Sequence, residues 1–257
     1  QQYKLAGAAL ATALSQVVGG TMPLFYFARK NSSILRLGRT AFDGRAILKA
    51  CTNGSSEFMS NVSMNIVGML YNTQLLKFAG ENGVAAYGVM MYVSMIFSAA
   101  FIGYSIGTAP VVGYHDGAKN YAELRSLLRK SLVMIGVFGV CMVASAELLS
   151  SRLARIFVGY DAALMELTVS GFQIFALSFV FMGFAIYGSS FFTALNDGLT
   201  SAVISFLRTL VFQVAAVLLL PAIWDIDGIW MSIVVAEFMA VVLTAAFLAT
   251  KRRKYHY

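Results

Sequence analysis

Apolar residues fall into seven blocks along the chain, and each block is long enough to cross a bilayer. The blocks are Leu5–Ala28, Ile47–Leu76, Val84–Val112, Ser131–Leu149, Leu164–Leu195, Leu199–Ala222 and Gly228–Thr250. A helix that spans the hydrocarbon core needs about 20 apolar residues. The pattern therefore predicts an all-α membrane protein, a multi-span helix bundle with seven transmembrane helices in this chain.

The connections between blocks predict the domain organisation. Only the polar and basic stretch 29–46 is long, so we expect a trailing helix at 1–30, a linker at 31–46 and a six-helix unit at 47–257 with a basic tail. The remaining connections are short turns rich in turn-forming residues, such as 79–83, 196–198 and 225–228, and short turns make neighbouring helices antiparallel. Residues 121–130 carry leucines at helical spacing among cations, which predicts a surface helix along the inner side of the membrane. The chain opens with Gln1 and has no initiator Met, and we interpret it as part of a longer protein.

The cations alternate from gap to gap. Fourteen lie after the first, third and fifth blocks or in the tail, if Lys49 at the start of the second block is included, against four near the other block ends, and Arg208 lies deep inside a block. A Lys/Arg excess in alternate loops marks the cytoplasmic side. We therefore expect an inner-membrane protein with a cytoplasmic C-terminus, whose loop cations set topology and touch anionic lipid headgroups.

Composition and residue types exclude several functional classes. The chain is 59% hydrophobic and 12% charged, unlike a soluble domain, and its net charge of +7 lies in short loops without a basic face carrying aromatics. Nucleic-acid binding is therefore not expected. Cys51 and Cys141 lie within spans, and His115 and His256 have no partner at ligand spacing, so we expect no disulfide, metal site or cofactor. No catalytic grouping is available, and we do not expect an enzyme.

The second block carries an unusual polar stripe. Asn53, Glu57, Asn61 and Asn65 recur at every fourth residue. Steps of four keep side chains on one slowly drifting helix face. Such a face cannot contact lipid, and a carboxylate at membrane depth costs roughly 2.5–3.5 kcal/mol on insertion scales. We interpret the stripe as an ion-coupling and substrate-binding surface, while a role in helix packing remains the alternative.

Arg208 and Glu237 form a candidate buried ion pair. Each lies about nine residues into its block, one from the inner end and one from the outer end, and the two helices are neighbours. With about 1.5 Å of rise per residue, their depths differ by only about 6 Å. Pairing is the usual way to hold either charge in a membrane. We expect a structural ion pair in preference to transport chemistry.

Aromatic and Met side chains concentrate in blocks three and five. They are the normal content of a core or a lipid-facing surface, but they can also line a cavity that accepts apolar cations. The cavity-lining candidates are Met91, Tyr92, Met95, Phe179 and Tyr187.

Three segments resemble one transporter family. The end of block three is similar to the helix-end signature of the multidrug and toxic compound extrusion (MATE) transporters. Its sequence is Gly107-Thr-Ala-Pro110-Val-Val-Gly113-Tyr-His-Asp-Gly117-Ala-Lys119-Asn120. The opening of the second half of these transporters resembles the segment from Gly54-Ser-Ser-Glu57-Phe through Gly83-Val-Ala-Ala-Tyr87-Gly. Their last two helices resemble the segment from Pro221 through Gly228-Ile-Trp230 to Ala236-Glu237. The resemblance covers nearly the whole chain and is nearest to the MepA-like bacterial branch.

The resemblance implies a twelve-helix antiporter built from two six-helix lobes around a central cavity. This chain would be the last helix of the missing N-terminal lobe followed by the C-terminal lobe. The implied function is efflux of cationic amphiphilic drugs or toxic compounds in exchange for H+ or Na+, by alternating access. Counting back from Tyr87, Asn65 lies nearer the position of one family carboxylate than Glu57 does, so both positions stay open as the coupling site.

Two alternative functions remain at this point. A lipid-linked oligosaccharide flippase of the same superfamily would need a strongly cationic lumen, whereas Arg208 is the cation found at depth here. A seven-helix receptor matches the helix count, but it leaves the long gap after the first span and the family-like segments unexplained.

Overall fold

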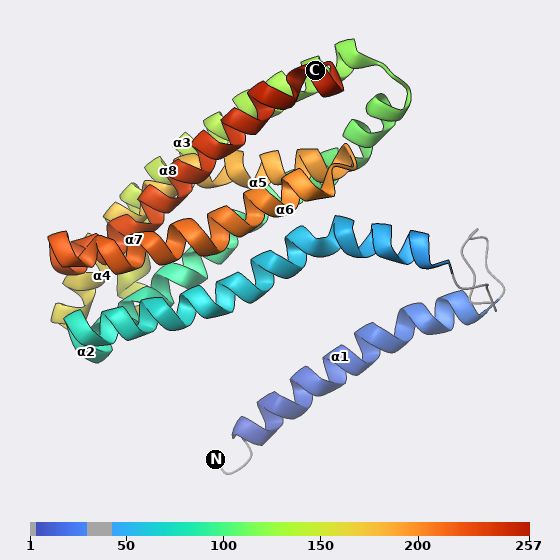
Figure 1. Cartoon of the computed structure of the whole chain (residues 1–257). Helices are drawn as coiled ribbons and strands as arrows, with labels where there is room; N and C mark the ends of the chain where they lie inside the picture. The colour runs from blue at the N-terminus through green and yellow to red at the C-terminus, as the bar shows by residue number, and fades with distance from the viewer. Residues whose placement is uncertain (1–3, 30–42) are drawn as a thin grey trace. The chain divides into compact units, whose positions relative to one another are not determined.

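The computed structural model describes residues 4–29 and 43–257, and the regular secondary structure in these ranges is helical (Figure 1). Two compact units result, Gln1–Ala46 and Ile47–Tyr257. The first contains α1 (Lys4–Ala28), which includes Pro23 and corresponds to the first apolar block. Most of the predicted linker 31–46 lies outside the described residues. The residues of the predicted six-helix unit, 47–257, are those of the second unit.

Helix α2 (Gly44–Gly117) combines two of the predicted spans. Only Gly80 leaves the helical conformation between them, with φ 62° and ψ −153°, a backbone state that glycine adopts without steric cost. Figure 1 shows the chain turning back at this bend. The predicted five-residue turn at 79–83 is thus a single-residue reversal, because helical geometry resumes at Glu81.

The remaining helices follow the later blocks with several differences. They are α3 (Tyr121–Val158), α4 (Ala162–Ala176), α5 (Ser178–Ala194), α6 (Gly198–Phe206), the π-helix η1 (Leu207–Phe212), α7 (Gln213–Leu219) and α8 (Pro221–Tyr255). The expected surface helix 121–130 is the first part of α3 and runs into the span without a break. The fifth block is divided, because α4 and α5 meet at a bend of 46°. The turn expected at 225–228 lies within α8, where Trp224 and Asp225 are non-helical.

The seven-span count is not confirmed. Within the described residues, four helices are long and apolar enough to cross a membrane, and the bent pair α4–α5 makes five if it is counted as one span. One of the four is the 60-residue segment Phe58–Gly117, which joins two of the predicted blocks. Helix α1 is not among these candidates. The chain is nevertheless an all-helical protein with several membrane-length apolar helices.

Two buried clusters hold the 47–257 unit together. The larger joins α2, α3, α4, α5, α7 and α8 around Phe175, Phe179 and Trp230. The smaller lies between α2, α3, α5, α6 and α8 around Tyr187 and Phe192. Helices approach closely at Gly171, where an added Cβ would lie 2.6 Å from the Met90 methyl and 2.8 Å from the Trp230 ring. Only glycine fits this crossing without displacement.

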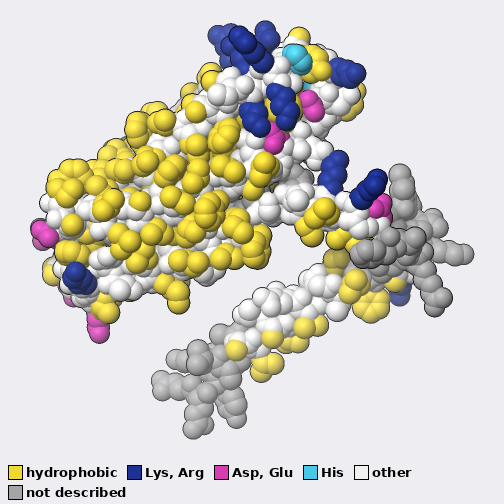
Figure 2. All heavy atoms as spheres, viewed as in Figure 1, with side chains coloured by type: hydrophobic (Ala, Val, Ile, Leu, Met, Phe, Trp, Pro, Cys, Tyr) yellow, Lys and Arg dark blue, Asp and Glu magenta, His cyan; other side chains and the backbone are white. Residues whose placement is uncertain are grey.

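Cations gather at the end of this unit that holds the C-terminus, while hydrophobic side chains cover the surface between its two ends (Figure 2). At the C-terminal end, Asp197 in the turn between α5 and α6 accepts hydrogen bonds from Lys251 Nζ (3.0 Å) and Tyr255 Oη (2.9 Å) of α8. Burial alone would raise the pKa of Asp197, but these bonds and those from Thr200 lower it to about 2. The carboxylate therefore stays ionised and fastens the end of α8 to this turn.

Candidate functional site

The first half of α2 separates a buried face from a polar one. Ser63, Val67, Tyr71 and Leu75 are buried at intervals of four residues. Asn61 and Asn65 are exposed, and Asn65 Nδ2 donates to the Asn61 carbonyl at 2.9 Å. With 3.6 residues per turn, these two positions lie roughly opposite the buried face. The described part of the polar stripe therefore points away from the packed interior of this unit.

The positions of Asn53 and Glu57 are on α2, but their side chains lie outside the described residues. Their place in the four-residue repeat with Asn61 and Asn65 is a property of the sequence and of the helix backbone.

A hollow of about 520 Å³, with mainly apolar walls, lies at the Gly80 bend. Its walls come from both halves of α2, with Asn72 and Thr73 on one side and Glu81, Val84 and Ala85 beyond the bend. The exposed polar face of the first half therefore continues into this hollow. Sequence reasoning missed Asn72 because it stands outside the four-residue repeat, seven residues beyond Asn65.

The cavity-lining candidates divide into two groups. Met91, Tyr92 and Met95 are 37%, 63% and 65% exposed on the second half of α2, and the Tyr92 ring stacks on Phe157 of α3. Phe179 and Tyr187 of α5 are 0% and 1% exposed. These two belong to the buried clusters, so the expectation that they line an open cavity does not fit their position.

Tyr187 differs from Phe179 in carrying a polar atom into the core. Its hydroxyl is buried without a hydrogen-bond partner in the described part of the chain, and its ring lies 6.0 Å from that of Tyr104. Phe179 contacts the rings of Phe97 and Phe175. Both side chains therefore contribute packing between α5 and its neighbours.

Arg208 and Glu237 form a two-point ion pair between η1 and α8. Arg208 Nε lies 2.8 Å from Glu237 Oε2, and its Nη2 lies 2.9 Å from Oε1. The Arg208 side chain is 16% exposed and that of Glu237 is 4% exposed. Fork-to-fork geometry of this kind is the strongest form of a carboxylate–guanidinium contact. The structure thus places the two predicted partners in direct contact.

A second polar contact extends this site into α2. Tyr71 Oη donates to Gln213 Oε1 at 2.8 Å, and both groups are buried. Gln213 follows Arg208 by five residues, which on an ideal α-helix would set the two side chains about 140° apart. The π-helix between them closes its hydrogen bonds over five residues and changes this relation. Helical periodicity in the sequence gave no signal for either Gln213 or η1.

The chemistry available in the described residues is that of hydrogen bonds and one buried charge pair. Within this part of the chain, no three His, Cys, Asp or Glu side chains come together as a metal site. The site residues that do meet form two pairs: Tyr71 with Gln213 joins α2 to α7, and Arg208 with Glu237 joins η1 to α8.

Comparisons with known proteins agree with this architecture. Residues 58–218 match the MatE family model. The multidrug export protein MepA of Staphylococcus haemolyticus (strain JCSC1435) is 22% identical over 250 residues, which cover 96% of this chain and 54% of the relative. MepA of Staphylococcus aureus (strain MRSA252) is 23% identical, over 90% of this chain and 51% of the relative. The chain spans about half the length of the curated relatives it matches.

Solved structures show the same fold. A MATE protein in complex with MaL6 superposes with a TM-score of 0.88 at 21% identity, over 99% of this chain and 58% of that chain. An outward-facing multidrug resistance MATE family transporter of the MOP superfamily gives 0.85 at 23% identity, over 97% and 56% respectively.

Proposed function

Because the MatE match covers more than half of its residues, the chain belongs to the MatE family, and we propose that the protein containing it is a secondary active efflux antiporter. It exports cationic amphiphilic drugs or toxic compounds in exchange for H+ or Na+ by alternating access. The chain supplies the helix at 1–30, the linker 31–46 and the C-terminal lobe at 47–257, and an N-terminal lobe completes the cavity. Neither the flippase nor the receptor alternative is favoured by the family match.

One observation carries this proposal beyond family membership. Asn61 and Asn65 are exposed on the side of α2 opposite its buried face, and Asn72 continues this polar side to the edge of a hollow at the Gly80 bend. Amide groups on a membrane helix need water or a polar partner, since lipid offers neither. A water-filled cavity between two lobes would provide that environment. The exposed Met91, Tyr92 and Met95 would give the cavity an apolar, polarisable wall for cationic amphiphiles.

In this mechanism Glu57 is the coupling group. When ionised, the Glu57 carboxylate attracts a drug cation or Na+. When protonated, it releases this cargo, so the proton and the cargo cation compete for the same carboxylate. Asn53, Asn61 and Asn65 supply neutral oxygen and amide groups around it. Alternating access then exposes the same site first to one side of the membrane and then to the other.

The gathering of cations at the C-terminal end of the bundle supports a cytoplasmic C-terminus (Figure 2). The basic last turn of α8 contributes Arg252, Arg253 and Lys254 to this end. The localisation that we propose is the bacterial inner membrane.

Efflux in proteoliposomes made with the full-length protein tests the proposal. An imposed proton gradient and, separately, an imposed sodium gradient identify the coupling ion by which of them drives export of a fluorescent cationic dye. Glu57→Gln removes the charge and keeps the shape, and it is expected to abolish gradient-driven export. Glu166→Gln, at an exposed position of α4, is the matched control and should export normally. Unimpaired export by Glu57→Gln would reject this residue as the coupling group, and export that ignores both gradients would reject antiport.

A further inference from the structure

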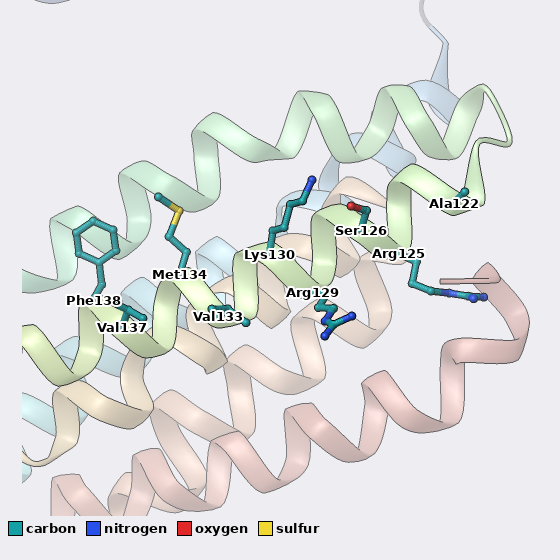
Figure 3. A pocket seen from close by; sticks show the side chains of 9 residues that line it. All are labelled: Ala122, Arg125, Ser126, Arg129, Lys130, Val133, Met134, Val137 and Phe138. Atoms are coloured by element: carbon teal, nitrogen blue, oxygen red, sulfur yellow. The ribbon is translucent and has the colours of Figure 1, made fainter.

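The first part of α3 carries a groove that the transport site does not use. Its volume is about 750 Å³, and it lies along one helix face, with lining residues spaced by three or four positions (Figure 3). The first half of this face is cationic and polar, formed by Arg125, Ser126, Arg129 and Lys130. Figure 3 shows Ser126 and Lys130 on one side of the α3 ribbon and Arg125 and Arg129 on the other. Cations thus border both edges of the groove.

These cations have little neutralisation from the protein. In the described ranges, Arg129 and Lys130 form no ion pair, and Arg125 makes only a 3.5 Å contact from Nη2 to the His256 carbonyl, which is uncharged. Glu123 is the one acid within residues 121–130, and it does not line the groove. The groove therefore presents uncompensated positive charge, which favours an anion.

The second half of the same face is apolar. Val133, Met134, Val137 and Phe138 continue the groove, and they are exposed by between 46% and 62%. From Lys130 to Phe138 the helix rises by about 12 Å, which fits within the roughly 15 Å of hydrocarbon in one leaflet. One continuous surface therefore offers a cationic end at headgroup level and an apolar length that matches acyl chains.

We propose that this groove is a binding site for an anionic phospholipid of the leaflet at the C-terminal end of the bundle. The phosphate lies between Arg129 and Lys130, the Ser126 hydroxyl donates a hydrogen bond to it, and an acyl chain follows Val133, Val137 and Phe138. The inference needs insertion of the chain in a membrane and does not depend on the transport cycle or on Glu57. Charge complementarity selects the headgroup, and the apolar continuation selects a lipid over free phosphate.

Native mass spectrometry of the full-length protein measures this preference. Phosphatidylglycerol and phosphatidylcholine with the same acyl chains are added in equal amounts, and the wild type is expected to retain about tenfold more of the anionic lipid. Arg129→Gln/Lys130→Gln should lose most of this preference. Arg152→Gln/Arg155→Gln removes the same charge from the other end of the same helix and should retain it. The swap Arg129→Lys/Lys130→Arg keeps both charges and should also retain it.

Several outcomes would overturn the proposal. Undiminished preference in Arg129→Gln/Lys130→Gln, or an equal loss in Arg152→Gln/Arg155→Gln, would show that the groove has no special role. Displacement of the lipid by millimolar inorganic phosphate would show a plain anion site. A photoactivatable phosphatidylglycerol provides a readout on the wild type alone, so that a misfolded variant does not stop the test. Crosslinks must concentrate in residues 122–138, and crosslinks elsewhere refute the site.

Discussion

Removing one partner of the Arg208–Glu237 pair should destabilise the protein far more than removing both. In Arg208→Met, the Glu237 carboxylate stays at membrane depth at 4% side-chain exposure and loses all three of its hydrogen bonds from the guanidinium. Breaking a buried pair in this way costs about 3–5 kcal/mol, and an isolated charge in a membrane helix costs a similar roughly 2.5–3.5 kcal/mol. We therefore expect a loss of about 3 kcal/mol.

The double variant Arg208→Met/Glu237→Leu has no stranded charge. Replacement of a buried ion pair by apolar residues of similar volume is often neutral or slightly stabilising, so its stability should lie within about 1 kcal/mol of the wild type. Glu237→Leu alone strands the Arg208 guanidinium and should also cost about 3 kcal/mol. The coupling energy, which is the loss in the double variant minus the sum of the two single losses, is then about 5–7 kcal/mol in magnitude. A value of this size would establish the pair as a clamp between η1 and α8.

Thermal unfolding of the full-length protein in detergent, followed by its intrinsic fluorescence, measures the effect. At about 2–4 °C per kcal/mol for a unit of this size, Arg208→Met should lower Tm by roughly 6–12 °C, and the double variant by less than about 4 °C. Arg152→Met, an exposed cation at the end of α3, is the control and should change Tm by no more than about 2 °C. A single variant as stable as the wild type, or a double variant as unstable as the sum of its singles, would refute the reasoning.

Two further predictions concern packing and pH. Gly171→Ala should destabilise the protein by about 1–3 kcal/mol, because the new methyl meets Met90 and Trp230; Gly107→Ala, where the space is open, should be nearly neutral in the same unfolding assay. Asp197→Asn should cost about 1 kcal/mol at pH 7 after allowance for solvent screening. The pKa of Asp197 is about 2 in the folded protein, below its ordinary 3.8, so this stabilisation is present above about pH 4 and is lost as the pH falls through 2. The difference in unfolding between variant and wild type should therefore be full at pH 7 and much smaller at pH 2, where about half of the folded Asp197 carboxylates are protonated. A gap as large at pH 2 as at pH 7 would contradict this assignment.

Much of the fold follows from local features of the sequence. Apolar blocks of about 20 residues mark helices, and the short turn predicted at 196–198 overlaps the observed connection between α5 and α6. The similar depths of Arg208 and Glu237 in neighbouring antiparallel helices predict their contact without other tertiary information, and the structure contains this ion pair.

What the sequence could not provide depends on packing and backbone detail. The reversal at Gly80 needs one residue where five were expected, since a single glycine at positive φ can redirect the chain. The π-helix η1 interrupts the 3.6-residue helical period, so no periodic pattern in the sequence predicts the Tyr71–Gln213 contact. The sequence does not distinguish the buried Phe179 and Tyr187 from exposed aromatic residues, because the same apolar residue types occur in a core and in the wall of a cavity. The roles of Asn53 and Glu57 stay predictions.

Helix α8 is fixed at two widely separated points, to η1 through Glu237 and to the α5–α6 turn through Lys251 and Tyr255. Sliding it along its axis by even one residue, about 1.5 Å, would lengthen both sets of contacts at once. Axial sliding and independent rotation of α8 are therefore opposed near its middle and near its C-terminal end together. A displacement applied near the bend at Trp224 and Asp225 would be transmitted along α8 to its C-terminal end, together with η1 and the α5–α6 turn.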